Sequence, residues 1–287
     1  MYWIKLILEL GKIRIAVLVA LSTATGYILA KGELTFAMLI PTLGVLLLAL
    51  GSGALNQYQE RFRDALMPRT ATRPIPDGRI SAFGALILAL LMIVAGTVVL
   101  WEGTNALAAF LGILTAIWYN GIYTNLKKVT PLAVIPGAVI GSLPPLIGWA
   151  AAIGTIWAVK PIMLALFFFI WQIPHFWLLL LNFGQDYEKA GYPSLTSLLD
   201  KSQLGRLTFV WIVATAVSII LMPLFGLGES QLIYLFLFIA SGLLVWRSIP
   251  LLKRDQNQRS YRLAFAGINI FILIVMLLLT LDRLIAT

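Results

Sequence analysis

The sequence predicts an all-α membrane protein with about nine transmembrane helices. Of its 287 residues, 60% are hydrophobic and only 11% are charged, and the mean hydropathy is +0.94. Soluble domains carry about 25% charged residues, so water cannot be the main solvent of this chain. Apolar stretches of about 18 to 25 residues recur along the chain, each long enough to cross a hydrocarbon core of about 30 Å. No secretory signal peptide stands out, because the apolar segment 15–30 has no small-residue cleavage site.

Nine apolar segments alternate with short polar loops. They cover residues 13–31, 36–57, 81–101, 106–120, 131–153, 161–182, 207–226, 230–248 and 263–281. We find no internal repeat, linker or soluble domain, so residues 1–287 are expected to form one integral-membrane domain.

The basic residues predict the orientation of these segments. If the segments cross the membrane in turn, eighteen of the 21 lysines and arginines fall on one side. The other three are Lys31, Lys160 and Arg283. Lysine and arginine concentrate in cytoplasmic loops, so the amino terminus is expected on the cytoplasmic side of the cell (inner) membrane. The net charge of +9 is thus mainly a topology signal facing lipid headgroups, and no nucleic-acid partner is expected.

Absent residue types narrow the chemistry. The chain has no cysteine, which excludes disulfides, thiolate nucleophiles and iron–sulfur clusters. Its single histidine, His175, excludes a zinc site with several histidine ligands in one chain. An enzyme of this composition would rely on carboxylates, amides, hydroxyls, arginine and lysine, which bind hard cations and anions.

The second apolar segment ends in a polar motif. Asn56, Glu60 and Asp64 are spaced i, i+4 and i+8, so a helix would stack their side chains on one face. Polar groups at membrane depth are costly unless they face a bundle interior or a wet cavity. Clustered oxygen ligands suit Mg²⁺, and Arg69 and Arg73 could then hold a diphosphate with their forked donors. The alternative is a helix end with ordinary interfacial charges.

A second acidic segment follows the sixth apolar segment. Asn182 and Asp186 repeat the i, i+4 spacing of amide and carboxylate. Both acidic segments fall on the same membrane face, so we expect them to form a two-sided metal clamp. Such a clamp would neutralise the charge that develops on a departing diphosphate when an allylic diphosphate ionises.

Polar residues also mark the end of the fourth apolar segment. Lys127 and Lys128 could contact the diphosphate or an anionic acceptor, or they could serve only as positive-inside anchors. Tyr119, Asn120 and Tyr123 put further polar groups at this end, as the mouth of a cavity would.

Two apolar blocks lie within later segments. Residues 137–149 combine small residues with Pro144-Pro145, which allows close helix packing and could also line a cavity. Residues 171–177 read Trp-Gln-Ile-Pro-His-Phe-Trp. His175 is either a hydrogen-bonded core residue or a contact for a bulky acceptor whose pocket Trp171 helps to shape. Aromatic faces there could also shelter a transient carbocation.

Together these motifs resemble those of the UbiA-type intramembrane prenyltransferases. The resemblance covers nearly the whole chain and is carried by residues 11–15, 56–74, 123–131, 144–149, 171–177 and 186–193. The acidic motifs are shared across that superfamily. The Pro-Pro-Leu-Ile-Gly-Trp and Trp-Gln-Ile-Pro-His-Phe-Trp blocks are similar to those of its haem-directed branch, the protoheme IX farnesyltransferases.

The resemblance implies nine helices around a central cavity that binds farnesyl diphosphate with Mg²⁺. It implies transfer of the farnesyl group, with addition of water, to a vinyl group of protoheme IX (haem B), giving haem O. On this basis the metal-binding and catalytic residues would be Asn56, Glu60, Asp64 and Asp186, with Asn182 as a further metal ligand. The diphosphate would be bound by Arg69, Arg73, Lys127 and Lys128, and the acceptor by His175, Trp171 and Tyr123. Downstream haem-modifying or oxidase-assembly proteins would be candidate partners.

The chain departs from the family pattern in two places. Glu60 and Phe62 stand where the first motif is usually richer in aspartate. Glu60 keeps the charge on a longer arm and Phe62 lies off the chelating face, so metal binding is expected to survive. Residues 193–196 read Pro-Ser-Leu-Thr, where the family tends to have Met-Leu-Pro after its proline. This altered loop affects the prediction of the acceptor more than the prediction of the reaction type.

Two other functions compete with haem farnesylation. A prenyltransferase of this type could act on a different acceptor, such as an aromatic acid that is a quinone precursor. A transporter with an ion site at the membrane midplane is a rival from another class. The ionisable residues lie at one face of the membrane, and no repeat is visible, which argues against the transporter.

Overall fold

The computed structural model describes residues 2–253 and 257–285. Within these ranges it contains nine helical segments long and apolar enough to cross a membrane, which confirms the predicted all-α membrane fold. Arg254, one of the eighteen basic residues assigned to the cytoplasmic side, lies outside the described residues.

Eleven α-helices make up the described chain. They are α1 (Tyr2–Leu10), α2 (Ile13–Lys31), α3 (Leu39–Asp64), α4 (Ala82–Gly103), α5 (Ala106–Ile117), α6 (Thr124–Leu126), α7 (Val134–Ile153), α8 (Val159–Lys189), α9 (Lys201–Ile220), α10 (Gln231–Ser248) and α11 (Gln258–Ile285). Helix α1 precedes the spans, and a π-helical turn, Trp118–Tyr123, joins α5 to α6 into one span.

Three spans run about two turns past the C-terminal ends that hydropathy alone predicted. The second span was expected to end at residue 57, but α3 continues to Asp64. The fourth span runs through the π-helical turn to Leu126 instead of ending at 120, and α8 continues to Lys189 instead of 182. The extra turns carry polar residues, which lower the local hydropathy but do not stop a helix whose polar side chains find partners.

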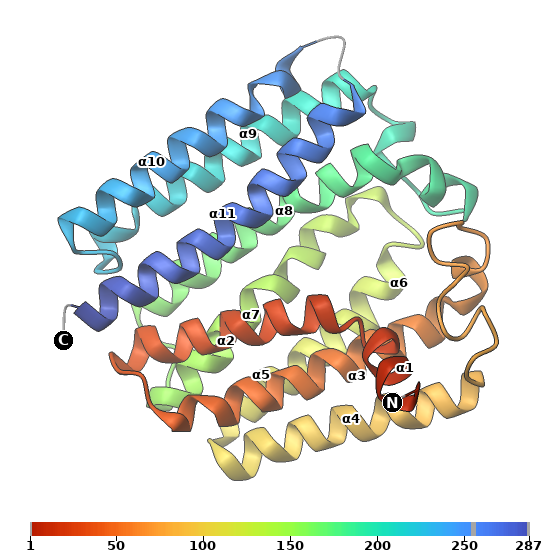
Figure 1. Ribbon diagram of the computed structural model, residues 1–287, viewed down its shortest axis with the longest axis horizontal. Coiled ribbons are helices and arrows are strands. Elements are labelled where there is room, and N and C mark those ends of the chain that lie inside the picture. Colours follow the sequence, from red (N-terminus) through yellow and green to blue (C-terminus); the bar gives the residue numbers. More distant parts are fainter. Residues whose placement is uncertain (1, 254–256, 286–287) are drawn as a thin grey trace.

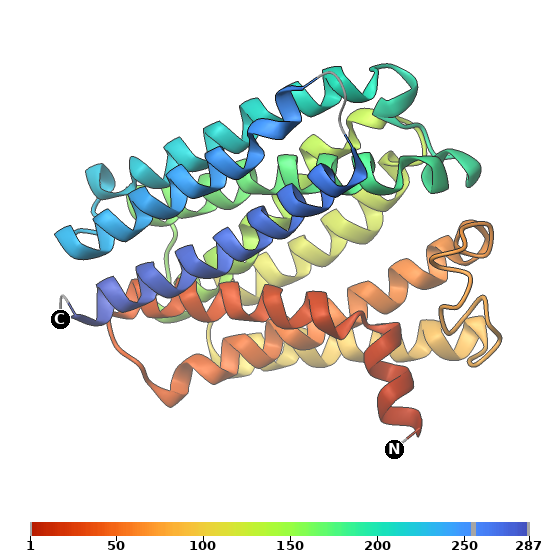
Figure 2. The same cartoon turned by 45° about the horizontal axis from the view of Figure 1, so that its top comes forward.

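The helices form two sub-bundles that pack side by side along their helix axes. Helices α2, α3, α4, α5 and α7 pack in a cycle, and α8, α9, α10 and α11 pack in a second cycle. Contacts of α7 with α8 and of α11 with α2 join the two. In Figures 1 and 2 the loops around residues 65–81 and 190–200 lie at one end of the molecule, and the C-terminus lies at the other. The segments that carry the polar motifs therefore gather at a single end.

The first sub-bundle is packed through small residues. A Cβ atom on Gly26 of α2 would collide with the backbone oxygen of Pro145 in α7. A Cβ atom on Gly148 of α7 would collide with the backbone oxygen of Thr23. The two helices therefore touch backbone to backbone, as small residues allow in membrane bundles.

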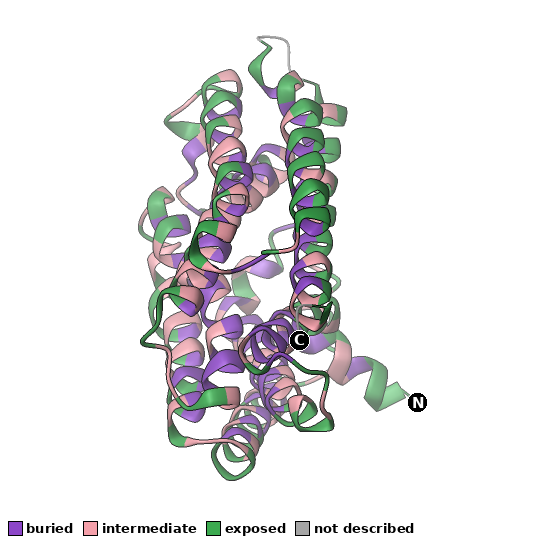
Figure 3. Cartoon of the chain, turned by 90° about the vertical axis from the view of Figure 1, so that its left-hand side faces the viewer, coloured by how far each residue is buried: buried purple, intermediate pink, exposed green. Residues whose placement is uncertain are grey.

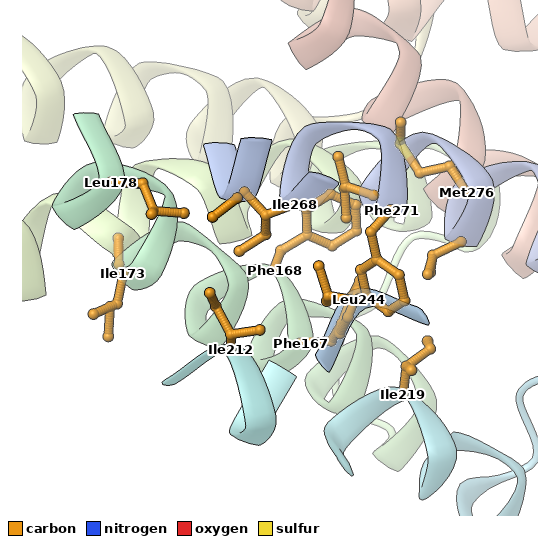
Figure 4. Packing of buried hydrophobic residues seen from close by; sticks show 14 of the residues in the cluster. Phe167, Phe168, Ile173, Leu178, Ile212, Ile219, Leu244, Ile268, Phe271 and Met276 are labelled. Atoms are coloured by element: carbon orange, nitrogen blue, oxygen red, sulfur yellow. The ribbon is translucent and has the colours of Figure 1, made fainter. Parts of the chain in front are cut away.

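The second sub-bundle is packed through large side chains. Figure 4 shows Phe167 and Phe168 of α8 packed among side chains of α9, α10 and α11, such as Ile212, Leu244 and Phe271. Exposed residues cover much of the outer faces of both sub-bundles in Figure 3, and these include many large apolar side chains. Such an outer surface suits a lipid environment, where apolar side chains can face outward without cost.

Candidate active site

Three oxygen-bearing side chains line the inner face of the last turns of α3. Asn56, Glu60 and Asp64 are only 1%, 4% and 1% exposed. An α-helix has 3.6 residues per turn, so this spacing places the side chains one above another on one face. Buried polar groups need partners, so the segments that face these oxygens determine what the site can do.

Both carboxylates of this row are ion-paired. The Lys127 ammonium lies 2.6 Å from Glu60 Oε1, and Arg73 Nη1 lies 2.7 Å from Asp64 Oδ2. The two cations come from different segments, one just after α6 and one in the loop between α3 and α4. The pairs compensate for burying two negative charges at the edge of the membrane.

The Asn56 amide is held between two further segments. Its Nδ2 donates to Thr124 Oγ1 at 3.1 Å, which leaves Oδ1 facing the site. The Lys12 ammonium donates to this Oδ1 at 2.6 Å and lies 3.5 Å from the Tyr119 hydroxyl. Burial, reinforced by the nearby Arg73 charge, lowers the pKa of Lys12 to about 7.

The loop between α3 and α4 is folded back on the site. Thr70 Oγ1 donates to the backbone oxygen of Asp64 at 2.8 Å. Further along, Arg79 donates Nη1 and Nη2 to the two carboxylate oxygens of Glu9, each at 2.7 Å. The hydrogen bonds from Arg79 hold the pKa of Glu9 below its usual range. The loop that carries Arg73 is thereby tied both to the end of α3 and to α1.

Tyr192, from the segment after α8, also reaches the first motif. Its hydroxyl donates to Glu60 Oε1 at 2.9 Å, and the Arg63 guanidinium lies over its ring, 4.5 Å from the centroid. Burial and the neighbouring Glu60 carboxylate raise the pKa of Tyr192, so the phenol stays protonated and acts as a donor.

The second acidic segment lacks the regular geometry expected for it. Phe183, between Asn182 and Asp186, has non-helical backbone angles (φ −133°, ψ 16°), so α8 is kinked there. A regular i, i+4 stacking of these two side chains is therefore not observed. Asn182 Nδ2 donates to Leu178 O of the same helix at 2.8 Å, and its buried Oδ1 has no hydrogen-bonding partner within the described ranges. Asp186 takes part in none of the ion pairs formed by the described residues.

Two of the expected diphosphate-binding residues lie away from the α3 carboxylates. The Arg69 guanidinium packs over the Phe183 ring, 5.1 Å from its centroid, beside the kink in α8. The Lys128 ammonium lies 3.4 Å from Asn125 Oδ1. Consecutive side chains at a helix end point in different directions, so Lys127 reaches Glu60 and Lys128 does not.

The oxygens on α3 fit a divalent cation only in part. Over the ranges that the structure describes, no three histidine, aspartate or glutamate side chains lie close enough to form a metal site. Each side chain of the α3 row nevertheless already has one oxygen facing a cation, whereas Asp64 Oδ1 is buried without a hydrogen-bonding partner among those residues. Carboxylate and amide oxygens suit Mg²⁺ when phosphate oxygens and water complete its shell. The row therefore fits Mg²⁺ that binds together with a diphosphate.

An aromatic row leads from this charged cluster to His175. Tyr119 stacks on Tyr123 with ring centroids 6.0 Å apart, and Tyr123 stacks on Phe176 at 5.9 Å. The rings of Phe176 and His175 meet edge to face at 5.8 Å, and His175 lies 4.9 Å from Trp171. The two tyrosines belong to the π-helical turn, a deviation that recurs at functional sites.

His175 has neighbours on α11 as well as on its own helix. Its ring lies 5.1 Å from that of Phe265 on α11. Its Nδ1 is buried and has no hydrogen-bonding partner among the described residues. A purely structural histidine would normally have both nitrogens satisfied, so His175 retains one nitrogen that a ligand could use.

A small cavity of about 50 Å³ lies beside the charged cluster. Lys127, Tyr187 and Tyr192 line its polar side, whereas Phe176 and Leu179 line its apolar side. The cavity thus places a basic group and two phenols directly beside apolar side chains. A larger cavity of about 350 Å³ between α9 and α10 is lined by apolar residues and one serine, and none of the residues described above contributes to it.

Sequence reasoning missed two residues of this cluster, Lys12 and Tyr192. Lys12 was interpreted as a positive-inside charge, although it occurs in the block 11–15 that carried part of the family resemblance. Tyr192 was not singled out, although it lies in the block 186–193. Their partners are 44 and 132 positions away in the chain, so no local spacing could have shown the contacts.

Comparison with known proteins is consistent with this geometry. The model of the UbiA prenyltransferase family matches residues 19–275. A protoheme IX farnesyltransferase from Geobacter sulfurreducens is 38% identical over 225 residues, which is 78% of this chain and 83% of that protein.

Solved structures share the fold at low sequence identity. One, from a study of digeranylgeranylglyceryl phosphate synthase, superposes with a TM-score of 0.78 at 16% identity, covering 99% of both chains. A UbiA homologue from Archaeoglobus fulgidus bound to GPP and Mg²⁺ superposes with a TM-score of 0.70 at 13% identity, covering 96% of this chain and 99% of that one. The helical fold, the match over most of the chain and the curated relative agree: the chain belongs to the UbiA prenyltransferase family.

Proposed function

We propose that this prenyltransferase moves the farnesyl group of farnesyl diphosphate to a vinyl group of protoheme IX and so produces haem O. The observation that carries the proposal is the 38% identity with a protein named protoheme IX farnesyltransferase, over 83% of that protein's length. The site supports it, because a buried row of oxygens and cations lies beside an amphipathic cavity and an aromatic row that ends at a histidine.

The donor would bind with its diphosphate between α3 and the cations that face it. Asn56, Glu60 and Asp64 would hold Mg²⁺, and Arg73 and Lys127 would move from these carboxylates to the phosphate oxygens. Support for the metal comes from the nature of these ligands and from the homologue solved with GPP and Mg²⁺. The farnesyl chain would follow the apolar side of the cavity, along Phe176 and Leu179.

The residues of the second acidic segment would join the site from α8. Asn182 and Asp186 would complete the metal site, and Arg69 would contact the diphosphate after a local movement of the kinked segment. The unpartnered Oδ1 of Asn182 and the packing of Arg69 against Phe183 support this role. We assign Lys128 to the headgroup region, because its ammonium contacts Asn125 and not the α3 row.

In the proposed reaction the C1–O bond of farnesyl diphosphate breaks and the diphosphate leaves as an anion. The new bond joins farnesyl C1 to the terminal carbon of the vinyl group, and water adds a hydroxyl to the neighbouring carbon with loss of a proton. A bound Mg²⁺ supplies stabilisation of the negative charge that develops on the diphosphate. The phenol of Tyr192 holds Glu60 in place, and the rings of Tyr119 and Tyr123 would stabilise an allylic cation by cation–π attraction.

The acceptor would lie at the far end of the aromatic row. Trp171, His175 and Tyr123 would contact the porphyrin, and the unpartnered Nδ1 of His175 supports this placement. Residues 1–287 would act as one domain in the cell (inner) membrane, with the charged cluster on the cytoplasmic side, as the distribution of lysine and arginine favours. Haem-modifying or oxidase-assembly proteins would receive the product.

Purified protein incubated with farnesyl diphosphate, Mg²⁺ and haem B tests this function. The expected product, detected by mass spectrometry, is a haem that has gained the farnesyl group and the elements of water. An aromatic hydroxy acid in place of haem B serves as the competing acceptor. Prenylation of that acid with no modified haem would overturn the proposal.

A haem titration tests the role of His175. Replacing His175 with alanine is expected to weaken haem binding and to change the absorption spectrum of the bound haem, because one polar contact to the porphyrin is lost. Leu179→Ala, which alters only the apolar side of the cavity, is the matched control. Unchanged affinity and spectrum in His175→Ala would reduce this histidine to a packing role.

A further inference from the structure

The backbone at Lys12 adopts an unusual conformation. Among the described residues it is the one residue other than glycine with a positive φ angle (φ 56°, ψ 53°). This left-handed region costs a non-glycine residue about 1 kcal/mol or more, so glycine is the usual residue at such a corner. A lysine that occupies the corner at this cost points to a use for its side chain.

The corner between α1 and α2 packs against α3 through hydrogen bonds and close backbone contacts. Gln57, next to Asn56 in the chain, donates Nε2 to the backbone oxygens of Glu9 and Leu10 at 3.2 and 2.8 Å. The backbone of Gly11 packs against α3, where a Cβ atom on Gly53 would lie 2.7 Å from Gly11 O. These contacts hold the backbone of residues 9–11 against α3, at Gly53 and at Gln57. The fold therefore sets the position of the neighbouring Lys12 ammonium.

Lys12 faces the same oxygen that the proposed function assigns to the metal. Its ammonium lies 2.6 Å from Asn56 Oδ1, and the Asn56 amide cannot turn this oxygen away without losing its bond to Thr124 Oγ1. One amide oxygen does not bind an ammonium and a metal ion in the same direction. The ammonium must therefore leave Asn56 Oδ1 when the metal arrives, and a half-buried cation then needs a new anionic partner.

We infer that Lys12 is a positioning residue for the diphosphate: it occupies the metal position at Asn56 while the site has no metal, and it shifts to a phosphate oxygen when metal and diphosphate enter together. With Lys127 and Arg73 it forms a set of three counter-cations, one each for Asn56, Glu60 and Asp64. The set would make metal binding depend on the diphosphate, because the metal alone must displace three cations from the oxygens that they face, without supplying an anion to receive them. The inference rests on the proposed metal–diphosphate site but is independent of the acceptor.

The test uses the purified full-length chain with Mn²⁺ and inorganic pyrophosphate, and it measures bound Mn²⁺ by electron paramagnetic resonance. In the unchanged protein, pyrophosphate is expected to raise the affinity for Mn²⁺ tenfold or more. In Lys12→Gln, which can still donate a hydrogen bond to Asn56 but carries no charge, two changes are expected. The affinity for pyrophosphate in the presence of Mn²⁺ should fall about tenfold, as for the loss of one charge-assisted hydrogen bond. The affinity for Mn²⁺ alone should stay equal or rise, because a competing cation has gone.

Two further variants separate positioning from structure. Lys5→Gln removes an exposed lysine on α1 and is expected to behave like the unchanged protein. Lys12→Arg keeps the charge and should keep most of the pyrophosphate affinity. Weaker binding in Lys12→Gln but not in Lys12→Arg would then reflect the lost charge and not a loss of folding. The inference is overturned if Lys12→Gln binds pyrophosphate as Lys5→Gln does, or if it loses affinity for Mn²⁺ and pyrophosphate equally.

The outcomes also distinguish this inference from the proposed function. If no haem is modified but Lys12→Gln still weakens pyrophosphate binding, the acceptor assignment fails and the role of Lys12 stands. If haem is farnesylated and pyrophosphate binding does not respond to Lys12→Gln, the role of Lys12 fails alone.

Discussion

The two acidic segments share an amide–carboxylate spacing but differ in their surroundings. On α3, Asn56, Glu60 and Asp64 are almost completely buried, and each has a protein cation within 2.7 Å. On α8, Asn182 and Asp186 are partly exposed, flank a kink and take part in none of the ion pairs found among the described residues.

The difference shows which half of the proposed clamp is organised before a ligand arrives. The oxygens on α3 are held by ion pairs and by Tyr192, so their positions require little change. Asn182 and Asp186 have no ion-pairing partner within the described part of the chain, so binding a metal would itself order them. Removing a residue from the first segment should therefore affect stability and turnover, whereas removing one from the second should affect turnover alone.

The largest effect is expected for Asp64→Asn. Loss of the charge at a buried metal ligand should lower the rate of farnesyl transfer about 10³-fold or more, which is the scale of removing one key electrostatic group. The rate is measured with farnesyl diphosphate, Mg²⁺ and haem B in detergent. Asp77→Asn, an exposed carboxylate of the same loop, is the control and should retain its activity. Full activity in Asp64→Asn would refute the metal role of α3.

Asp186→Asn should lower turnover about 10²-fold while the unfolding temperature stays unchanged, because no ion pair of the described structure is lost. The comparison requires both measurements on one preparation, by product formation and by thermal unfolding in detergent. Glu188→Gln, two residues further on, is the matched control for turnover. A clear fall in the unfolding temperature of Asp186→Asn would show that the second segment is organised in advance too.

The ion pair between Glu60 and Lys127 is expected to contribute about 1–3 kcal/mol to the free energy of unfolding. Glu60→Gln and Lys127→Met should each destabilise the fold, because each leaves a poorly solvated partner. The double variant should be more stable than the sum of the single effects predicts. A double-mutant cycle by thermal unfolding measures this coupling, and strict additivity would mean that the pair is not formed.

The smallest effect is expected at Glu9 and Arg79, outside the membrane. The pKa of Glu9 is lowered by Arg79, so the stabilisation is present above the ordinary pKa of glutamate and is lost as the pH falls through the lowered value. For this largely exposed pair the effect is about 0.5 kcal/mol. Glu9→Gln should therefore unfold slightly earlier than the unchanged protein at pH 7, and the difference should disappear once the pH is below the lowered pKa of Glu9. A difference that persists at low pH would show that the pair does not act through charge.

The sequence predicted much of the fold and the residue types of the first motif. Hydropathy located all nine of the spans found in the described ranges, because each must bury about twenty apolar residues in lipid. The row on α3 was visible because it depends only on helical spacing. The ends of α3 and α8 were missed, because their last turns are polar and their stability depends on partners elsewhere in the chain.

The arrangement of the cations could not be predicted in the same way. Lys127 and Lys128 are adjacent and chemically alike, and only the path of the backbone after α6 decides which one reaches Glu60. Lys12 and Tyr192 reach the row from distant segments, and their roles depend on how α1 and the segment after α8 pack. The kink at Phe183 is marked in the sequence only by the neighbouring Gly184, and a single glycine does not by itself predict a kink, so the regular spacing of Asn182 and Asp186 was misleading.

The backbone contacts of α2 with α7 restrict how the bundle can open. Gly26 meets the backbone of Pro145 and Gly148 meets that of Thr23, so the two helices cannot slide or separate without breaking a fitted surface. They should therefore move as one rigid unit. We therefore expect a bulky acceptor that enters from the lipid to pass on the side formed by α8 and α11, where larger side chains separate the helices. The small residues of the first sub-bundle would thus determine the side of the bundle from which the acceptor enters the site.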